Sequence, residues 1–150
     1  IVVRLVGSEM CIRDRMKSHP SPTKIRELVV QALYQKKITG DSNTKVLGEL
    51  KQTNKKLVLD KVSQILKEIK LFEKDFSKTI TDFSNIPFER IGGIELSILY
   101  LALYEVSKSN LDKPIIINEA IKLAKKFGQN SSHKFINAIL DKVIKSEIVI

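Results

Sequence analysis

Cysteine and histidine are scarce in this sequence of 150 residues, which contains one cysteine, Cys11, and two histidines, His19 and His133. A single cysteine forms neither an internal disulfide nor a cysteine-based zinc site, and it favours a reducing compartment, so we expect a cytoplasmic protein. The two histidines fall in different predicted elements, and neither has a carboxylate or a cysteine nearby at metal-ligand spacing. The sequence therefore predicts no metal site and no cofactor.

Long apolar runs are also missing. The longest candidate, residues 94–103, is interrupted by Glu95 and Ser97 and falls well short of the roughly 20 residues that cross a bilayer. Gly92-Gly93 lacks the other glycines and the preceding strand of a phosphate-binding fingerprint, and no activated-nucleophile signature is present. We therefore expect neither a membrane span nor an enzyme.

The charge is strongly one-sided. Lys and Arg number 26 against 17 Asp and Glu, which gives a net charge of +9, and the hydrophobic share of 43% argues for a folded basic domain. Residues 1–15 resemble translated sequencing-adapter read-through, with Met16 as the expected start, and residues 16–150 alone still carry +8. Only Arg26 and Arg90 stand among the lysines there, so we expect an anionic partner to be held mainly by point charges.

Hydrophobic periodicity predicts an all-α domain. Residues 16–22 contain Pro20 and Pro22 and are typical of a flexible basic arm. Thr23 is expected to cap the first helix, which ends at Gly40. Four further helices have apolar residues at spacings of three or four, and a weak helix is expected at 45–51. The predicted helices cover residues 23–39, 45–51, 58–83, 91–106, 117–127 and 132–144, all within a single domain at 23–150.

The helix at 91–106 is apolar almost all round, which predicts that the core is built around it. Gly92-Gly93 is unfavourable in a helix interior, so either this helix begins after the two glycines or a neighbouring segment packs unusually close there. Gly128 is expected to end the helix at 117–127 in a left-handed conformation. Ser131 or Ser132 is expected to cap the last helix.

Four segments carry a more specific pattern: Ala32-Leu33-Tyr34-Gln35, Ala102-Leu103-Tyr104-Glu105-Val106, Ile117-Asn118-Glu119-Ala120-Ile121-Lys122-Leu123-Ala124-Lys125 with Phe127-Gly128, and Ser132-His133-Lys134-Phe135-Ile136-Asn137-Ala138-Ile139-Leu140-Asp141. In order and spacing, over residues 24–145, the chain closely resembles the NusB family of bacterial transcription antitermination factors. The resemblance implies a compact helical domain of two small bundles without catalytic activity. Such proteins bind boxA-type single-stranded RNA together with NusE, a small-subunit ribosomal protein, and join the RNA polymerase antitermination complex on ribosomal RNA operons.

The candidate RNA-binding residues come from two sources. A basic arm before a helix N-terminus places cations beside free backbone N–H groups, which suits phosphate and points to Lys17, Lys24 and Arg26. The resemblance adds positions on or near the family's RNA surface: Tyr34, Ser132, His133, Lys134 and Phe135. The family often has several arginines where this sequence has Ser21-Pro22-Thr23, so RNA affinity is expected to depend more on Lys17 and on lysines elsewhere.

Glu89 and Glu95 correspond to family positions that face NusE. Their acidity is locally unusual on a chain of +8, and a basic ribosomal protein complements it. Ser131 replaces an acidic residue of the family, which leaves the contact of the last helix open between partner and RNA. Dimers occur in the family, so a monomer and a homodimer are both open.

Each candidate also has an ordinary structural interpretation. Tyr34 and Phe135 lie beside core positions, as packing residues do. Exposed lysines are usually solvated charges, and glutamates commonly favour helix N-termini. Two other functions stay open: the NusB-like RNA-binding module of a ribosomal RNA cytosine methyltransferase, whose catalytic domain would have to follow Ile150, and a helical protein-interaction domain without an RNA role.

Overall fold

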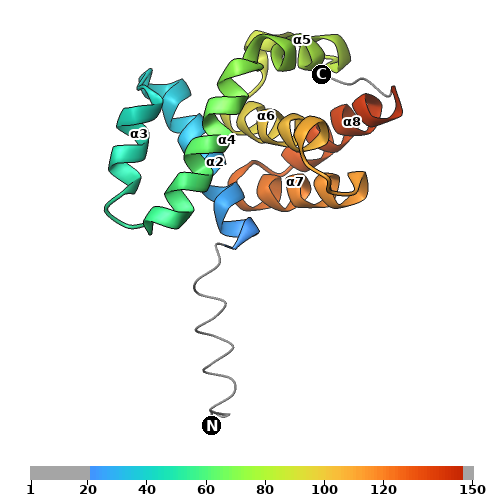
Figure 1. Ribbon diagram of the computed structural model, residues 1–150. Helices are drawn as coiled ribbons and strands as arrows, with labels where there is room; N and C mark the ends of the chain where they lie inside the picture. The colour runs from blue at the N-terminus through green and yellow to red at the C-terminus, as the bar shows by residue number, and fades with distance from the viewer. Residues whose placement is uncertain (1–20, 147–150) are drawn as a thin grey trace, which may run out of the picture.

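The computed structural model describes residues 21–146, so the predictions for residues 1–15 and for most of the arm at 16–22 lie outside the described residues. Within this range the chain forms seven α-helices, one 3₁₀ turn and no strand, which confirms the all-α prediction (Figure 1). The elements are α2 (Pro22–Thr39), α3 (Asn43–Leu50), α4 (Lys56–Leu71), α5 (Glu73–Phe83), η1 (Phe88–Arg90), α6 (Gly93–Lys108), α7 (Lys113–Phe127) and α8 (Ser132–Lys145).

Helix α6 lies at the centre of the molecule, where α2, α4, α5, α7 and α8 all contact it (Figure 1). As its apolar sequence predicts, it is buried on almost every side, and its buried apolar residues are Leu96, Ile98, Leu99, Leu101, Ala102 and Leu103. Helix α2 packs with α3 and α4, whereas α7 and α8 pack against each other and against α6. These two groups are the two small bundles expected of the fold, and they meet where α2 lies along α6.

The N-cap of helix α2 lies two residues earlier than predicted, because it is Ser21 and not Thr23. Ser21 has an extended backbone, and its Oγ accepts a long hydrogen bond of 3.5 Å from the backbone N–H of Lys24. Pro22 takes the first helical position, where the missing N–H has no intrahelical partner to lose. The helix ends as predicted at Gly40, whose φ of 75° is left-handed.

The prediction of a single long helix at 58–83 is wrong, because the chain bends at Phe72 and forms two helices, α4 and α5, instead. Phe72 has φ −105° and ψ 14°, and its N–H is shared between the carbonyl oxygens of Glu68 and Ile69. The ring of Phe72 packs 6.1 Å from that of Phe76, and the Lys108 ammonium lies 4.1 Å from its centroid. The apolar spacing continues across the bend, so periodicity alone does not reveal it.

Two glycine positions are tight. Gly92 is the N-cap of α6 and Gly93 is its first residue, and a methyl group on Gly93 would lie 2.9 Å from Cε1 of Tyr34. Of the two alternatives for Gly92-Gly93, the close approach of a neighbouring segment is confirmed, because α2 packs against Gly93, whereas the helix begins at Gly93 and not after both glycines. Gly128 is not left-handed as predicted, because its φ of −93° and ψ of −172° are extended. Glycine is needed there for space, since a methyl group would lie 2.8 Å from Oγ of Ser132.

The described residues contain neither a candidate membrane span nor a candidate metal-binding cluster. None of the helices within 21–146 is both long enough and apolar enough to cross a membrane. The same residues hold no cluster of three or more His, Cys, Asp or Glu side chains that could bind a metal ion.

Leu99→Ala should lower the free energy of unfolding by about 2–5 kcal/mol, because the Leu99 side chain is fully buried in α6 and its removal leaves a cavity. Leu71→Ala is the matched control, since it makes the same chemical change at a residue that is 78% exposed, with an expected effect within about 0.5 kcal/mol. Urea unfolding followed by circular dichroism measures both. Equal losses in the two variants would contradict a core centred on α6.

Candidate nucleic-acid and partner interface

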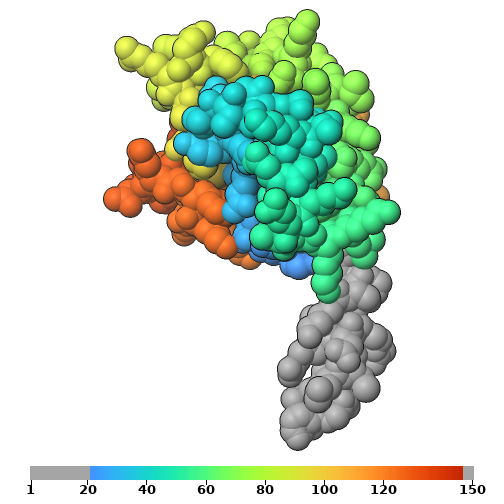
Figure 2. Space-filling view, turned by 90° about the vertical axis from the view of Figure 1, so that its left-hand side faces the viewer, coloured from blue at the N-terminus to red at the C-terminus, as the bar shows by residue number. Residues whose placement is uncertain are grey.

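The first turn of α6 brings together predicted site residues from three helices. Tyr34 of α2 packs against Gly93, and Ser132 of α8 is hydrogen-bonded to Glu95. Figure 2 shows this face of the molecule, where the segment before α6 (yellow) and the α7–α8 connection (orange) project on either side of a hollow beside α2 and α3. Residues that the sequence assigned separately to RNA and to NusE are therefore neighbours.

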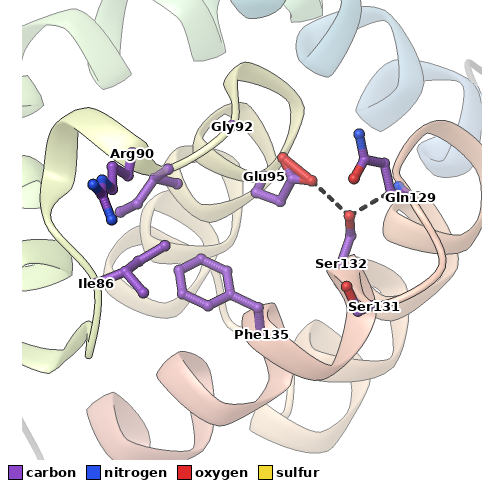
Figure 3. Close-up of a pocket in the computed structure, with 9 residues that line it drawn as sticks. Ile86, Arg90, Gly92, Glu95, Gln129, Ser131, Ser132 and Phe135 are labelled. Carbon is purple, nitrogen blue, oxygen red and sulfur yellow. Dashed lines mark hydrogen bonds between the residues drawn. The ribbon is translucent and has the colours of Figure 1, made fainter.

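A short chain of hydrogen bonds links α8 to α6. The backbone N–H of Gln129 donates to Oγ of Ser132 at 2.9 Å, and this hydroxyl donates to Oε1 of Glu95 at 2.5 Å (Figure 3). Glu95 lies in the first turn of α6 and also faces the N-terminal end of α8, where a negative charge is favoured by both helix dipoles. The bond thus fixes the start of α8 against the start of α6.

These residues form one side of a pocket of about 440 Å³. On the other side, Figure 3 shows the side chains of Ile86 and Arg90 gathered near the half-buried ring of Phe135. The pocket therefore offers an aromatic surface, a guanidinium and a carboxylate within one concave site. Its lining residues are Ile86, Arg90, Ile91, Gly92, Glu95, Gln129, Ser131, Ser132 and Phe135.

The other predicted site residues lie around this pocket or apart from it. Lys134 is exposed and His133 is half-buried in the first turn of α8, while Glu89 is exposed in η1. Lys24 is exposed in the first turn of α2, and its separation of ten positions from Tyr34 corresponds to about 15 Å along the helix. Lys17 lies outside the described residues. The structure thus gathers the α6 and α8 candidates at one place and leaves Lys24 at a separate one.

Arg26 is held inside the molecule by two carboxylates. Its Nε donates to both carboxylate oxygens of Glu105, at 3.0 and 3.2 Å, and its Nη2 lies 2.9 Å from Oε2 of the same residue. Its Nη1 lies 3.7 Å from Oε2 of Glu119, and only 11% of the Arg26 side chain is exposed. The guanidinium therefore ties α2 to α6 and α7, and an RNA phosphate would have to compete with these two carboxylates for it.

Three groups around α6 have shifted pKa values. Burial lowers the pKa of Lys36, and the charge of Glu73 opposes this shift. Burial raises the pKa of Tyr100, whose hydroxyl lies 2.7 Å from Oγ of Ser77, and it raises that of Tyr104 well above the usual range. Neither tyrosine lines the pocket beside Glu95, so these shifts lie outside the candidate site.

Sequence reasoning did not single out Arg90 or Gln129 as site residues. Arg90 is one of two arginines in residues 16–150 and follows the predicted partner residue Glu89, which was the available signal. Gln129 had no such signal, because only its backbone N–H takes part in the hydrogen-bonded chain. Glu95 and Ser132 are 37 residues apart, so no local pattern connects them.

Comparison with known proteins identifies the family. A family model described as the NusB family matches residues 23–145. The chain belongs to the NusB family. The transcription antitermination protein NusB of Buchnera aphidicola subsp. Cinara cedri (strain Cc) is 43% identical to it over 136 residues, which cover 83% of this chain and 90% of that protein.

Two solved structures have the same fold. T. maritima NusB matches with a TM-score of 0.76 and 27% identity, over 85% of this chain and 93% of that chain. A structure of the antitermination factors NusB and NusE in complex with dsRNA matches with a TM-score of 0.72 and 18% identity, over 83% of this chain and 96% of that chain. The resemblance seen in the sequence motifs is thus confirmed for the family and for the fold.

Arg26→Gln should lower the free energy of unfolding by about 1.5–3 kcal/mol, since it removes charge-assisted hydrogen bonds between helices and leaves Glu105 and Glu119 without their shared cation. Lys24→Gln removes the same charge from an exposed side chain two residues away and should change the stability by less than about 0.5 kcal/mol. Urea titrations compare the two variants. Indistinguishable midpoints would argue against the interhelical role of Arg26.

Proposed function

We propose that this chain is a transcription antitermination factor that binds boxA-type single-stranded RNA together with NusE and joins the RNA polymerase antitermination complex on ribosomal RNA operons. It acts in the cytoplasm as an adaptor without catalytic activity. Membership of the NusB family supports this role, and one structural relative was solved with NusE and double-stranded RNA. The observation that carries the proposal at the level of the site is the meeting of Tyr34, Glu95 and Ser132 at the first turn of α6.

On the RNA side, the proposal combines exposed cations with aromatic rings. Lys24 and Lys134 are exposed in the first turns of α2 and α8, Tyr34 is partly exposed beside Gly93, and the half-buried Phe135 lines the pocket. Single-stranded RNA is commonly bound in this way, with cations along the phosphates and aromatic side chains stacked on unpaired bases. Arg26 contributes indirectly, because its ion pairs hold the start of α2 in place.

On the partner side, the proposal rests on charge. Glu89 and Glu95 lie just before and within the first turn of α6, on a chain whose net charge is +9. A basic ribosomal protein approaching this chain is repelled by most of its surface and attracted at these carboxylates, which fixes both the place and the orientation of docking.

Binding of a boxA oligonucleotide should weaken steeply with salt. If about four phosphates are contacted, the logarithm of the association constant falls with a slope near −3 against the logarithm of the salt concentration, at roughly 0.7 per phosphate. The double variant Lys24→Gln/Lys134→Gln should reduce this slope by about 1.4 and weaken binding across RNA sequences. Gel-shift titrations at several salt concentrations, with and without NusE, measure both effects.

The control for this experiment is Lys74→Gln/Lys78→Gln, which removes the same charge from exposed positions on α5, at the opposite end of the molecule from the first turn of α2 (Figure 1). It should leave the salt slope unchanged. A flat salt response of the unmodified chain contradicts the electrostatic part of the proposal. Capture of NusE that persists at high salt, with no RNA shift at all, identifies a protein-interaction domain instead.

Glu89→Gln/Glu95→Gln should weaken the capture of NusE by about fivefold or more, because it removes the acidic groups that the basic partner recognises. Affinity for boxA RNA in the absence of NusE should stay within about twofold, since neither change removes a cation. Asp75→Asn/Asp82→Asn on α5 is the charge-matched control. Surface plasmon resonance with immobilised NusE gives the first quantity, and the opposite division of effects would refute the assignment of surfaces.

A further inference from the structure

The hydroxyl of Ser132 makes two hydrogen bonds inside the protein. A hydroxyl has one proton to donate and can accept two hydrogen bonds. Ser132 donates its proton to Oε1 of Glu95 and accepts the N–H of Gln129. The residue is 4% exposed, and the approach over Gly128 is so tight that even a methyl group there would lie 2.8 Å from Oγ. An RNA group therefore has little access to this hydroxyl, although the residue lines the pocket.

The group that this contact holds is the carboxylate of Glu95. Its second oxygen, Oε2, lies directly over Gly92, so closely that any side chain at that position would displace it. Gly92 is exposed and lines the pocket, so a cation can approach Oε2 from outside. The carboxylate is thus fixed through one oxygen and offered through the other.

We propose that Ser132 is a positioning residue of the partner surface: it holds the Glu95 carboxylate in the orientation that a cationic side chain of NusE binds, and it makes no contact with RNA. This inference rests on the proposed function and reassigns Ser132, which the family resemblance placed on the RNA surface. A carboxylate that is already oriented loses less conformational freedom on binding. Ordering one flexible side chain at an interface corresponds to roughly a two- to twelvefold change in affinity.

Ser132→Ala removes the hydroxyl, and Ser63→Ala is its matched control. Ser63 is a half-buried serine of α4 and does not line this pocket. We expect Ser132→Ala to raise the Kd for NusE by roughly two- to twelvefold and to leave the Kd for boxA RNA alone within about twofold. Ser63→Ala should change neither. Loss of RNA affinity in Ser132→Ala with intact NusE capture, or no change in either, would overturn the proposal.

A double-mutant cycle tests whether Ser132 acts through Glu95. Glu95→Gln removes the charge that NusE recognises, so a residue that only orients this charge has nothing left to orient. The double variant Ser132→Ala/Glu95→Gln should therefore bind NusE no more weakly than Glu95→Gln alone. Additive losses in the double variant would show that Ser132 acts independently of Glu95 and would refute the positioning role.

Gly92→Ala provides a second perturbation that keeps both side chains. The added methyl group displaces Oε2 of Glu95 while the hydroxyl of Ser132 and the net charge remain. It should weaken NusE capture to a similar degree as Ser132→Ala, again with unchanged affinity for RNA alone. Unchanged NusE capture would mean that the orientation of the carboxylate does not matter, which contradicts the proposal even if Ser132→Ala proves unstable.

Amide hydrogen exchange separates this inference from the proposed function. The N–H of Gln129 should exchange faster in Ser132→Ala than in Ser63→Ala, because it loses its acceptor. If the unmodified chain binds RNA but not NusE, the positioning role fails while RNA binding stands. If it binds neither, the proposed function fails, and faster Gln129 exchange then identifies Ser132 as a purely structural residue.

Discussion

The constraint on which the structure depends is the nearly complete burial of α6. A helix that is apolar on all sides must be covered on all sides, and α2, α4, α5, α7 and α8 do this. The cover leaves the N-terminal turn of α6 near the surface, where Gly93 lets the Tyr34 side chain of α2 approach closely and Gly92 leaves room for the Glu95 carboxylate. Tyr34 from α2 and Ser132 from α8 reach that turn for this reason. The candidate interface is therefore a product of the core packing.

The packing of the helices also determines which cationic side chains are ion-paired inside the protein and which are exposed to solvent. A guanidinium makes several hydrogen bonds in one plane, which suits Arg26 to join Glu105 and Glu119 on two different helices. A lysine at this position offers one point charge and holds the helices less firmly. The chain thus uses one of its few arginines for an internal contact, whereas lysines such as Lys24 and Lys134 remain exposed.

The core was predictable because burial leaves a trace in the sequence, and α6, which is buried on almost every side, is apolar almost all round. The bend at Phe72 was not, since the apolar spacing runs through it without a break. The N-cap of α2 was misplaced because Ser21 and Thr23 are both good capping residues and only the backbone decides between them. The hydrogen bond between Glu95 and Ser132 joins two distant helix starts, and no rule of local spacing contains it.

The first turn of α8 explains how two surfaces can lie so close together and still be distinct. Successive residues of a helix point about 100° apart, so Ser132 and Lys134 face nearly opposite directions. Ser132 is accordingly buried against α6 while Lys134 is exposed, and Phe135, one turn after Ser132, returns to the side of the pocket. One helical turn can therefore orient a carboxylate for a protein partner through Ser132 and present a cation to RNA through Lys134, without the two roles sharing a side chain.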